Sequence, residues 1–455
     1  MPKERTRDMT VGAPMPILLA FIMPLLLGLL FQQFYAMVDT VVVGNFLGME
    51  ALAGVGSTGS ISFLVLGLCN GICAGFAIPV AQKFGEKDYE GLRDFVGNMI
   101  WLGALLALTI TLATTLGCRW ILTAMKTPES TFSYAYDYIF LIFLAIPATM
   151  LYNLLSGILR SLGDSRTPLL FLIFSSLLNV ALDLVCVVWL QMGVAGAGWA
   201  TLVSQLISGL LCLVYMAKKF PILRLHRENL KLRSFCAHRL LLMGLPMGMQ
   251  YSITAIGSIL LQTAVNGLGP VAMAAVAASG KVTNLFACPY DAMGTMAATF
   301  AGQNLGAGKL QRVREGVRDC AILGTVYFVI AMAAMYFGGA QMAGLFLDSK
   351  DAASAAEILP LARQMLVTNA AFYIPLLGVN LYRFTIQGLG YSNLAVIAGV
   401  FEMIARGAVA IGLVPVIGFT AVCYASPAAW ILADLFLVPA YHMCIKRREK
   451  EAQSA

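Results

Sequence analysis

Two aspartates lie inside long apolar segments, where a carboxylate is costly to place. Asp39 belongs to the segment 16–43 and Asp183 to the segment 167–190. An ionisable side chain at the centre of a membrane helix costs roughly 2.5–3.5 kcal/mol on insertion scales, so such residues are candidates for function. Both segments are predicted to be helices whose chain crosses the membrane toward the outside. Each aspartate then lies at a similar depth below the outer end of its helix. The two carboxylates are therefore predicted to share a site.

Neutral oxygen ligands surround these two positions in the sequence. Asn179 precedes Asp183 by one helical turn, and residues spaced i,i+4 share a helix face. Tyr35 lies one turn before Asp39, and Thr201 lies in the next apolar segment, 193–216. Carboxylate, amide and hydroxyl oxygens suit a monovalent cation such as Na⁺, or a proton shared by coupled carboxyls. The alternative is that each polar group is only hydrogen-bonded inside a helix bundle.

The second half of the chain carries a different polar set. Glu402 and Arg406 are spaced i,i+4 and are predicted to form a structural ion pair. Lys281 and Asp291 are near three turns apart on one segment and are not expected to touch. The weaker candidates for substrate binding or support of coupling are these four residues together with Gln33, Asn153 and Tyr35, and Pro24, which can bend the first segment.

The elements that hold these residues are predicted to be membrane-spanning helices. Of the 455 residues, 59% are hydrophobic and only 12% are charged, against about 25% in average soluble domains. Apolar runs of about 20 residues cross a roughly 30 Å hydrocarbon core. The chain is thus expected to be an all-α integral membrane protein with twelve spans, near 16–43, 51–80, 95–117, 138–159, 167–190, 193–216, 240–265, 272–300, 317–340, 360–386, 393–415 and 420–442.

Lysine and arginine are concentrated in the loops that twelve spans place on one side. These loops include the central stretch 217–239 and the tail 443–455. Because cytoplasmic loops carry an excess of Lys and Arg, both termini and the central linker are predicted to be cytoplasmic, in a cell (inner) membrane. The net charge of +7 has the same origin, so it does not indicate a nucleic-acid partner.

The two halves of the chain repeat each other. The segment 47–56 reads LGMEALAGVG, and the segment 268–277 reads LGPVAMAAVA, with five identical positions at an offset of 221. A later match aligns 162–165 with 389–392. The sequence therefore predicts two parallel six-helix lobes, 1–216 and 240–442, separated by the basic linker 217–239. Such repeats are one recurring plan of transporters, because a cavity between two bundles can open alternately to each side.

The ordered set of motifs resembles the multidrug and toxic compound extrusion (MATE) transporters, particularly their DinF-like branch. The matching features are Pro24 followed by Tyr35 and Asp39, the Asn179-x-x-x-Asp183 pair, the GAGWAT run ending at Thr201, and the GQNLGAGK run at 302–309. The resemblance implies the MATE fold and a first-lobe cation site at Asp39, Asn179, Asp183 and Thr201. It also implies exchange of Na⁺ or H⁺ for a bulky, often cationic organic compound, by a protein expected to be a monomer.

Two alternatives belong to other classes. A lipid-linked oligosaccharide flippase of the same superfamily would need a strongly cationic cavity, and Lys281 and Arg406 are the deep basic residues that the sequence indicates. A membrane enzyme would need a nucleophile with a base or a metal cluster. The histidines, His226, His238 and His442, lie in or beside cytoplasmic segments, and no CxxC or GxxxxGK[ST] motif occurs. Neither a cofactor nor ATP is therefore expected, and the coupling ion is the only small ligand besides the substrate.

Overall fold

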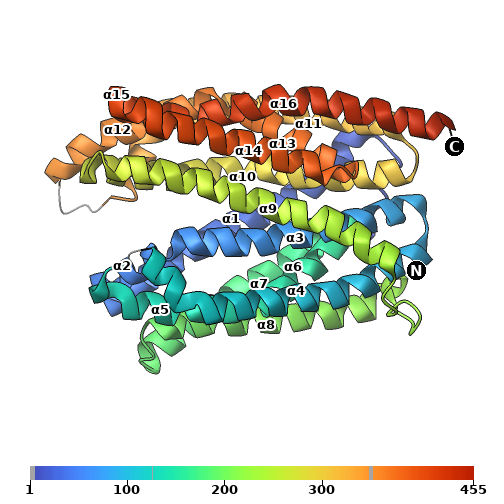
Figure 1. Ribbon diagram of the computed structural model, residues 1–455, viewed down its shortest axis with the longest axis horizontal. Helices are drawn as coiled ribbons and strands as arrows, with labels where there is room; N and C mark the ends of the chain where they lie inside the picture. The colour runs from blue at the N-terminus through green and yellow to red at the C-terminus, as the bar shows by residue number, and fades with distance from the viewer. Residues whose placement is uncertain (1–5, 126, 348–351, 455) are drawn as a thin grey trace. The chain divides into compact units, whose positions relative to one another are not determined.

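Helices account for nearly all of the computed structural model, which describes residues 6–125, 127–347 and 352–454. Ten helical segments in these ranges are long and apolar enough to cross a membrane, and two bent helix pairs make twelve when each counts as one span. The elements, in chain order in Figure 1, are α1 (Pro14–Leu47), α2 (Met49–Ser57), α3 (Gly59–Glu86), α4 (Tyr89–Ala124), α5 (Glu129–Leu144), α6 (Ile146–Ser161), α7 (Arg166–Asp183), η1 (Leu184–Trp189), α8 (Val194–Lys219), η2 (Pro221–Leu223), α9 (Ser234–Asn266), α10 (Pro270–Gly306), α11 (Leu310–Gly344), α12 (Ala352–Ala371), α13 (Tyr373–Gly388), α14 (Ser392–Ala408), η3 (Val409–Leu413), α15 (Val414–Ile417) and α16 (Phe419–Ser454).

The two halves of the chain share backbone features, as their sequence similarity indicated. The fourth span breaks between α5 and α6 with a bend of 44°, and the tenth breaks between α12 and α13 with a bend of 52°. The fifth and eleventh spans each pass into a π-helix, η1 and η3. Glycines with positive φ follow the same order in both halves, as Gly48 and Gly269, Gly163 and Gly390, and Gly193 and Gly418. Local geometry therefore recurs even where side chains have diverged.

Two compact units divide the chain. The first comprises residues 23–248 with the short segment before Thr10, and the second comprises 10–22 and 249–455. Consequently α1 begins in the second unit and continues in the first, whereas α9 begins in the first unit and continues in the second. Both crossing points lie next to a proline inside the helix, Pro24 in α1 and Pro246 in α9. Proline removes a helical hydrogen bond, which makes these points easy to bend.

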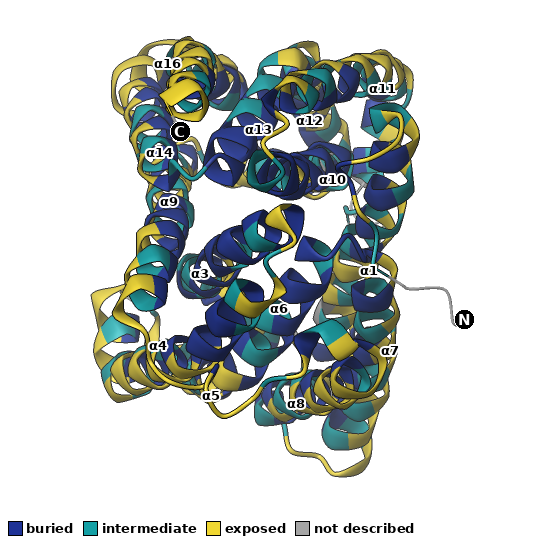
Figure 2. Cartoon of the chain, turned by 90° about the vertical axis from the view of Figure 1, so that its right-hand side faces the viewer, coloured by how far each residue is buried: buried dark blue, intermediate teal, exposed yellow. Residues whose placement is uncertain are grey.

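The first unit is packed around α3 and α6. Their side chains are largely buried, whereas α4, α5 and α8 present exposed faces (Figure 2). The α3 helix approaches α9 closely because both helices carry glycine at spacing four. A Cβ added at Gly71 would lie 2.5 Å from the carbonyl oxygen of Met247, and one at Gly75 would lie 2.6 Å from the Cα of Gly244. Small residues at such spacing allow membrane helices to pack backbone to backbone.

The second unit uses the same pairing of helices. Here α10 packs against α13, in the positions that α3 and α6 hold in the first unit. A Cβ added at Gly388 would lie 2.5 Å from the carbonyl oxygen of Ala298, and Gly294 faces the ring of Phe384.

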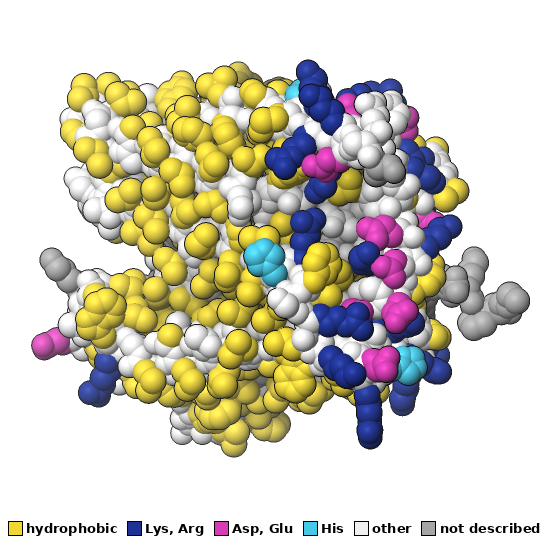
Figure 3. All heavy atoms as spheres, turned by 45° about the vertical axis from the view of Figure 1, so that its right-hand side comes forward, with side chains coloured by type: hydrophobic (Ala, Val, Ile, Leu, Met, Phe, Trp, Pro, Cys, Tyr) yellow, Lys and Arg dark blue, Asp and Glu magenta, His cyan; other side chains and the backbone are white. Residues whose placement is uncertain are grey.

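Hydrophobic side chains cover much of the surface along the helices, and Lys and Arg side chains gather toward one end of them (Figure 3). This distribution fits helices that cross a bilayer.

Candidate functional site

Helices α1 and α7 bring the two predicted carboxylates together in the first unit. Asp39 lies eight residues before the end of α1, and Asp183 is the last residue of α7, at the start of the π-helix η1. Asp183 is fully buried and Asp39 is partly buried. The two carboxyl groups are near enough to interact electrostatically. A π-helix is a widened helical turn that is frequent at functional sites. Here the widened turn begins directly after Asp183.

Two tyrosines border the carboxylates. The hydroxyl of Tyr138, on α5, donates a hydrogen bond to the carboxylate of Asp39. Tyr35, which lies one turn before Asp39, is close enough to interact electrostatically with both Asp39 and Asp183. Tyr138 was not among the predicted site residues. It stands at the first position of the predicted fourth span, so a survey of polar residues within that span would have included it.

Asn179 and Thr201 complete the first-half cluster. The amide of Asn179 donates to the hydroxyl oxygen of Thr201 at 3.4 Å, and that hydroxyl donates to the carbonyl oxygen of Ala197 at 3.1 Å. Asn179 is buried, whereas Thr201 is partly buried. The two neutral ligands that the sequence proposed are therefore hydrogen-bonded to each other across α7 and α8.

Several oxygens of this cluster are buried without a donor. Among the described residues, no hydrogen-bond partner reaches Oδ1 of Asp39, Oδ1 of Asn179, or either carboxylate oxygen of Asp183. A buried acceptor without a partner is costly and calls for an explanation. Four such oxygens on three residues of this cluster form a suitable environment for a cation or a shared proton. The donor set, two carboxylates with an amide and a hydroxyl, fits a hard monovalent ion such as Na⁺.

Pro24 and Asn153 lie apart from this cluster. They line a small pocket of about 90 Å³ together with residues of α6 and α7. Asn153 donates to the side-chain oxygen of Asn70 at 2.7 Å. Pro24 is fifteen residues before Asp39, or about 22 Å along a helix. Gln33, on the same helix, is partly buried. The structure therefore places Pro24 and Asn153 in a separate polar region of the first unit.

The second unit contains a compact group of charges around Arg383. Glu402 accepts from Arg406 at 3.4 Å, which confirms the predicted ion pair, and it also pairs with Arg383 of α13. All three side chains are buried. Asp291 and Asp434 interact electrostatically with Arg383 as well. Arg383 and Asp434 lie inside predicted spans, so the same rule that identified Glu402 could have identified both.

Lys281 lies away from this group. Its ammonium sits 5.4 Å from the centre of the Phe346 ring, a cation–π contact within the second unit. No salt bridge joins Lys281 to Asp291 among the described side chains, as their spacing predicted. The prediction that Lys281 and Arg406 are the deep basic residues was incomplete, because Arg383 is buried beside Arg406. Glu402 offsets their charge, so the group is not a strongly cationic cavity.

The fold and this site define a multi-pass helical membrane protein with a buried acidic cluster in one of two repeated units. Comparison with known proteins gives its family. The family model described as MatE matches residues 24–185 and 246–411, which together make up more than half of the chain. The chain therefore belongs to the MatE family.

Individual relatives agree with this assignment. The "Probable multidrug resistance protein YpnP" of Bacillus subtilis (strain 168) is 29% identical over 387 residues, 84% of this chain and 83% of the relative. The "Multidrug export protein MepA" of Staphylococcus saprophyticus is 22% identical over 383 residues, 84% of each protein. The solved structure described as MATE in complex with MaL6 has a TM-score of 0.91 at 21% identity, and covers 99% of this chain and 100% of that one. The all-helical MATE fold is thus confirmed, and the family is one of transporters rather than enzymes.

Proposed function

We propose that this protein is a cation-coupled antiporter of the DinF-like branch that exports bulky organic compounds by alternating access. Family membership and the drug-resistance and drug-export names of its relatives support export of drug-like molecules. The observation that carries the coupling mechanism is the group of buried, unpartnered oxygens at Asp39, Asn179 and Asp183. In this proposal Na⁺ or H⁺ enters at that group.

The coupling step follows from electrostatics in a low-dielectric site. Two nearby carboxylates repel each other, and burial weakens the solvation of their charges. A cation bound between Asp39 and Asp183, or a proton shared by them, relieves that repulsion. Asn179 and Thr201 supply neutral oxygens, and Tyr138 holds Asp39 in place through its hydroxyl. Loss of the ion makes the occupied arrangement unfavourable, so ion binding and release favour different conformations.

Helix α1 is the proposed carrier of this signal. It holds Asp39 in the first unit and begins in the second, with Pro24 beside the crossing point at Met23. A change of ion occupancy at Asp39 therefore acts on a helix that belongs to both units. Pro24 gives that helix a place to bend, and Pro246 gives α9 the equivalent place.

The test uses purified protein in proteoliposomes with the sodium and proton gradients imposed separately. Efflux of a fluorescent organic cation such as ethidium should follow one of the two gradients. Asp39→Asn and Asp183→Asn should each abolish gradient-driven efflux, because each removes a charge that the ion neutralises. Asp137→Asn is the matched control, since Asp137 is an exposed aspartate on α5 of the same unit.

The outcome is judged on protein normalised for the amount reconstituted. Wild-type rates in both asparagine variants would mean that the first-half cluster is structural and that coupling lies elsewhere, with the charges around Arg383 as the next candidate. Efflux that follows neither gradient would overturn the antiport mechanism itself. We also propose that the protein is a monomer. Both of its termini are proposed to lie in the cytoplasm, as the loop charges predict.

A further inference from the structure

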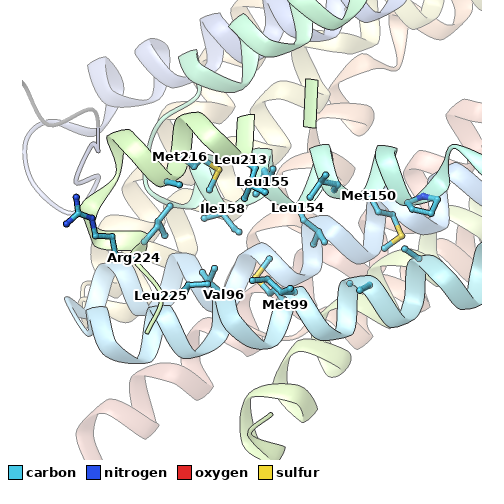
Figure 4. A pocket seen from close by; sticks show the side chains of 18 of the residues that line it. Val96, Met99, Met150, Leu154, Leu155, Ile158, Leu213, Met216, Arg224 and Leu225 are labelled. Atoms are coloured by element: carbon cyan, nitrogen blue, oxygen red, sulfur yellow. The ribbon is translucent and has the colours of Figure 1, made fainter. Parts of the chain in front are cut away.

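A large apolar cavity of the first unit lies away from the acidic cluster. It has a volume of about 960 Å³ and is lined by apolar side chains of α4, α6 and α8, with the segment that follows η2 at one end. Figure 4 shows Val96 and Met99 of α4 facing Leu155 and Ile158 of α6, with Arg224 at the end of the pocket. Neither Asp39 nor Asp183 contributes to its wall. The cavity is therefore distinct from the proposed ion site.

The cavity begins next to the break in the fourth span. Before the break, α5 packs against both α4 and α8. At Ala145 the chain turns by 44°, and Pro147 begins the wall of the pocket. After the turn, α6 packs closely on α3 in the core of the unit and also contacts α4 and α8. The cavity is a groove among α4, α6 and α8 that begins at Pro147, just after the bend.

The groove opens toward the hydrocarbon of the bilayer. Ile100, Leu108 and Leu213 line it and are 47%, 57% and 44% exposed. In a membrane-spanning unit, exposed apolar side chains on α4 and α8 face lipid. From Val96 to Leu108 the groove follows α4 for about 18 Å. One leaflet provides about half of a roughly 30 Å hydrocarbon core, so the groove spans the depth of a single leaflet.

Basic side chains stand at one end of this apolar groove. Arg224 and His226 line it there, and both are exposed. Arg224 forms no salt bridge with any described residue. Its neighbours along the chain include Lys218, Lys219 and Arg227, against the single acidic residue Glu228. This end of the groove therefore favours a negative charge.

Buried polar contacts fix the segment that carries Arg224 and His226. The backbone N–H of His226 donates to the side chain of Asn229 at 3.0 Å, and Asn229 donates to Asp94 of α4 at 2.8 Å. Asn229 and Asp94 are each 4% exposed. The indole N–H of Trp101 adds a bond to the carbonyl oxygen of Leu230 at 2.8 Å. The basic end is thus held in position against α4.

We propose that this groove binds one anionic phospholipid, with an acyl chain between α4, α6 and α8 and the phosphate at Arg224 and His226. The apolar wall, the single-leaflet length and the basic end each match one part of that molecule. Basic pockets between membrane helices on the cytoplasmic side are known to bind anionic head groups. A cationic drug would place its charge in hydrocarbon or beside an arginine, so the transported compound is a poor match.

The experiment measures lipid that stays with the full-length protein. The protein is reconstituted in vesicles of equal phosphatidylglycerol and phosphatidylcholine, extracted in mild detergent, and weighed by native mass spectrometry. About one phosphatidylglycerol per protein should be retained. A double variant, Arg224→Ala with His226→Ala, should lower this retention at least fivefold. Arg227→Ala is the matched control, because Arg227 is an exposed arginine of the same segment outside the groove.

A second pair of variants tests the apolar part. Ala104→Phe should fill the groove and also lower phosphatidylglycerol retention at least fivefold. Ala113→Phe is its control, since Ala113 is exposed on the same helix but outside the groove. Equal retention of both lipids, or retention unchanged in the groove variants, would overturn the proposal. So would binding of tetraphenylphosphonium that is lost in Ala104→Phe while lipid retention stays, because that result would identify a drug site.

Discussion

At the scale of single residues, the hydrogen bond from Tyr138 to Asp39 gives a test of how the first-half cluster is tuned. Hydrogen bonds to charged groups contribute about 1.5–3 kcal/mol. Tyr138→Phe removes that donor and leaves the ring in place. The apparent affinity for the coupling ion should therefore change by at least tenfold in efflux assays at varied ion concentration, while maximal efflux is retained. Tyr136→Phe is the control, as Tyr136 stacks on Phe140 of the same helix. Unchanged affinity in Tyr138→Phe would show that this bond is incidental.

Glu402 illustrates a carboxylate with a structural role. It is buried between Arg383 and Arg406, and both arginines keep a side-chain nitrogen without a partner among the described residues. Glu402→Gln would leave the buried Arg406 without its carboxylate partner and Arg383 with only the carboxylates of Asp291 and Asp434, so we expect a loss of about 3–5 kcal/mol in the free energy of unfolding. Thermal unfolding of purified protein in detergent checks this, with the exposed Glu357→Gln as control.

A double variant sharpens that test. Glu402→Gln combined with Arg406→Gln removes the cation that loses its carboxylate partner, so it should recover part of the lost stability. If Glu402→Gln melts like the wild type, the ion pair contributes nothing to the fold and Glu402 would be free to act in coupling.

The sequence predicted some of the site residues and missed others, for a physical reason. Asp39 and Asp183 stand out because a charge in an apolar segment is a local signal. The bond between Tyr138 and Asp39 joins α5 to α1, so it depends on packing that no spacing rule reports. Arg383 was detectable in principle but lies nineteen residues from its partner Glu402, beyond any helical periodicity.

At the scale of elements, the contact of α3 with α9 depends on glycine. A Cβ at Gly75 would lie 2.6 Å from the backbone of Gly244, so even alanine must push the helices apart. Gly75→Ala should therefore lower stability by about 1–3 kcal/mol, as overpacking does in other cores. Thermal unfolding measures the loss. Gly59→Ala, on the same helix with open space at its Cβ, should be neutral or slightly stabilising. Equal melting of the two variants would contradict the close packing.

Element positions and two of the internal breaks were predictable from the sequence. The twelve predicted apolar segments correspond to the ten long helices and the two bent pairs. The breaks at Ala145 and Phe372 lie two and three residues before Pro147 and Pro375, and proline inside an apolar segment is a sequence signal for a kink. The π-helices η1 and η3 were not predicted, since a widened turn is set by packing rather than by composition.

At the scale of the whole molecule, the loop charges predict which side of the membrane each loop faces. Glu228 is exposed in the basic linker, so a cysteine there should react with a membrane-impermeant maleimide only in permeabilised cells or inverted vesicles. Background should be low, because nine of the ten native cysteines are buried and Cys186 is partly buried. Met192→Cys, in the loop between η1 and α8, should react from outside. Labelling of position 228 in intact cells would reverse the orientation.

The division of α1 and α9 between the compact units has the form of a domain swap. Each half of the polypeptide gives its first helical segment to the unit built mainly from the other half: residues 10–22 to the second, and the start of α9 to the first. Two copies of a single six-helix chain make such a reciprocal exchange when they form a swapped dimer. In this chain the basic linker between α8 and α9 joins the two halves covalently, so the exchange takes place within one polypeptide. Each half can therefore carry a different polar set: Asp39 and Asp183 stand in the first, and Glu402 with its two arginines stands in the second.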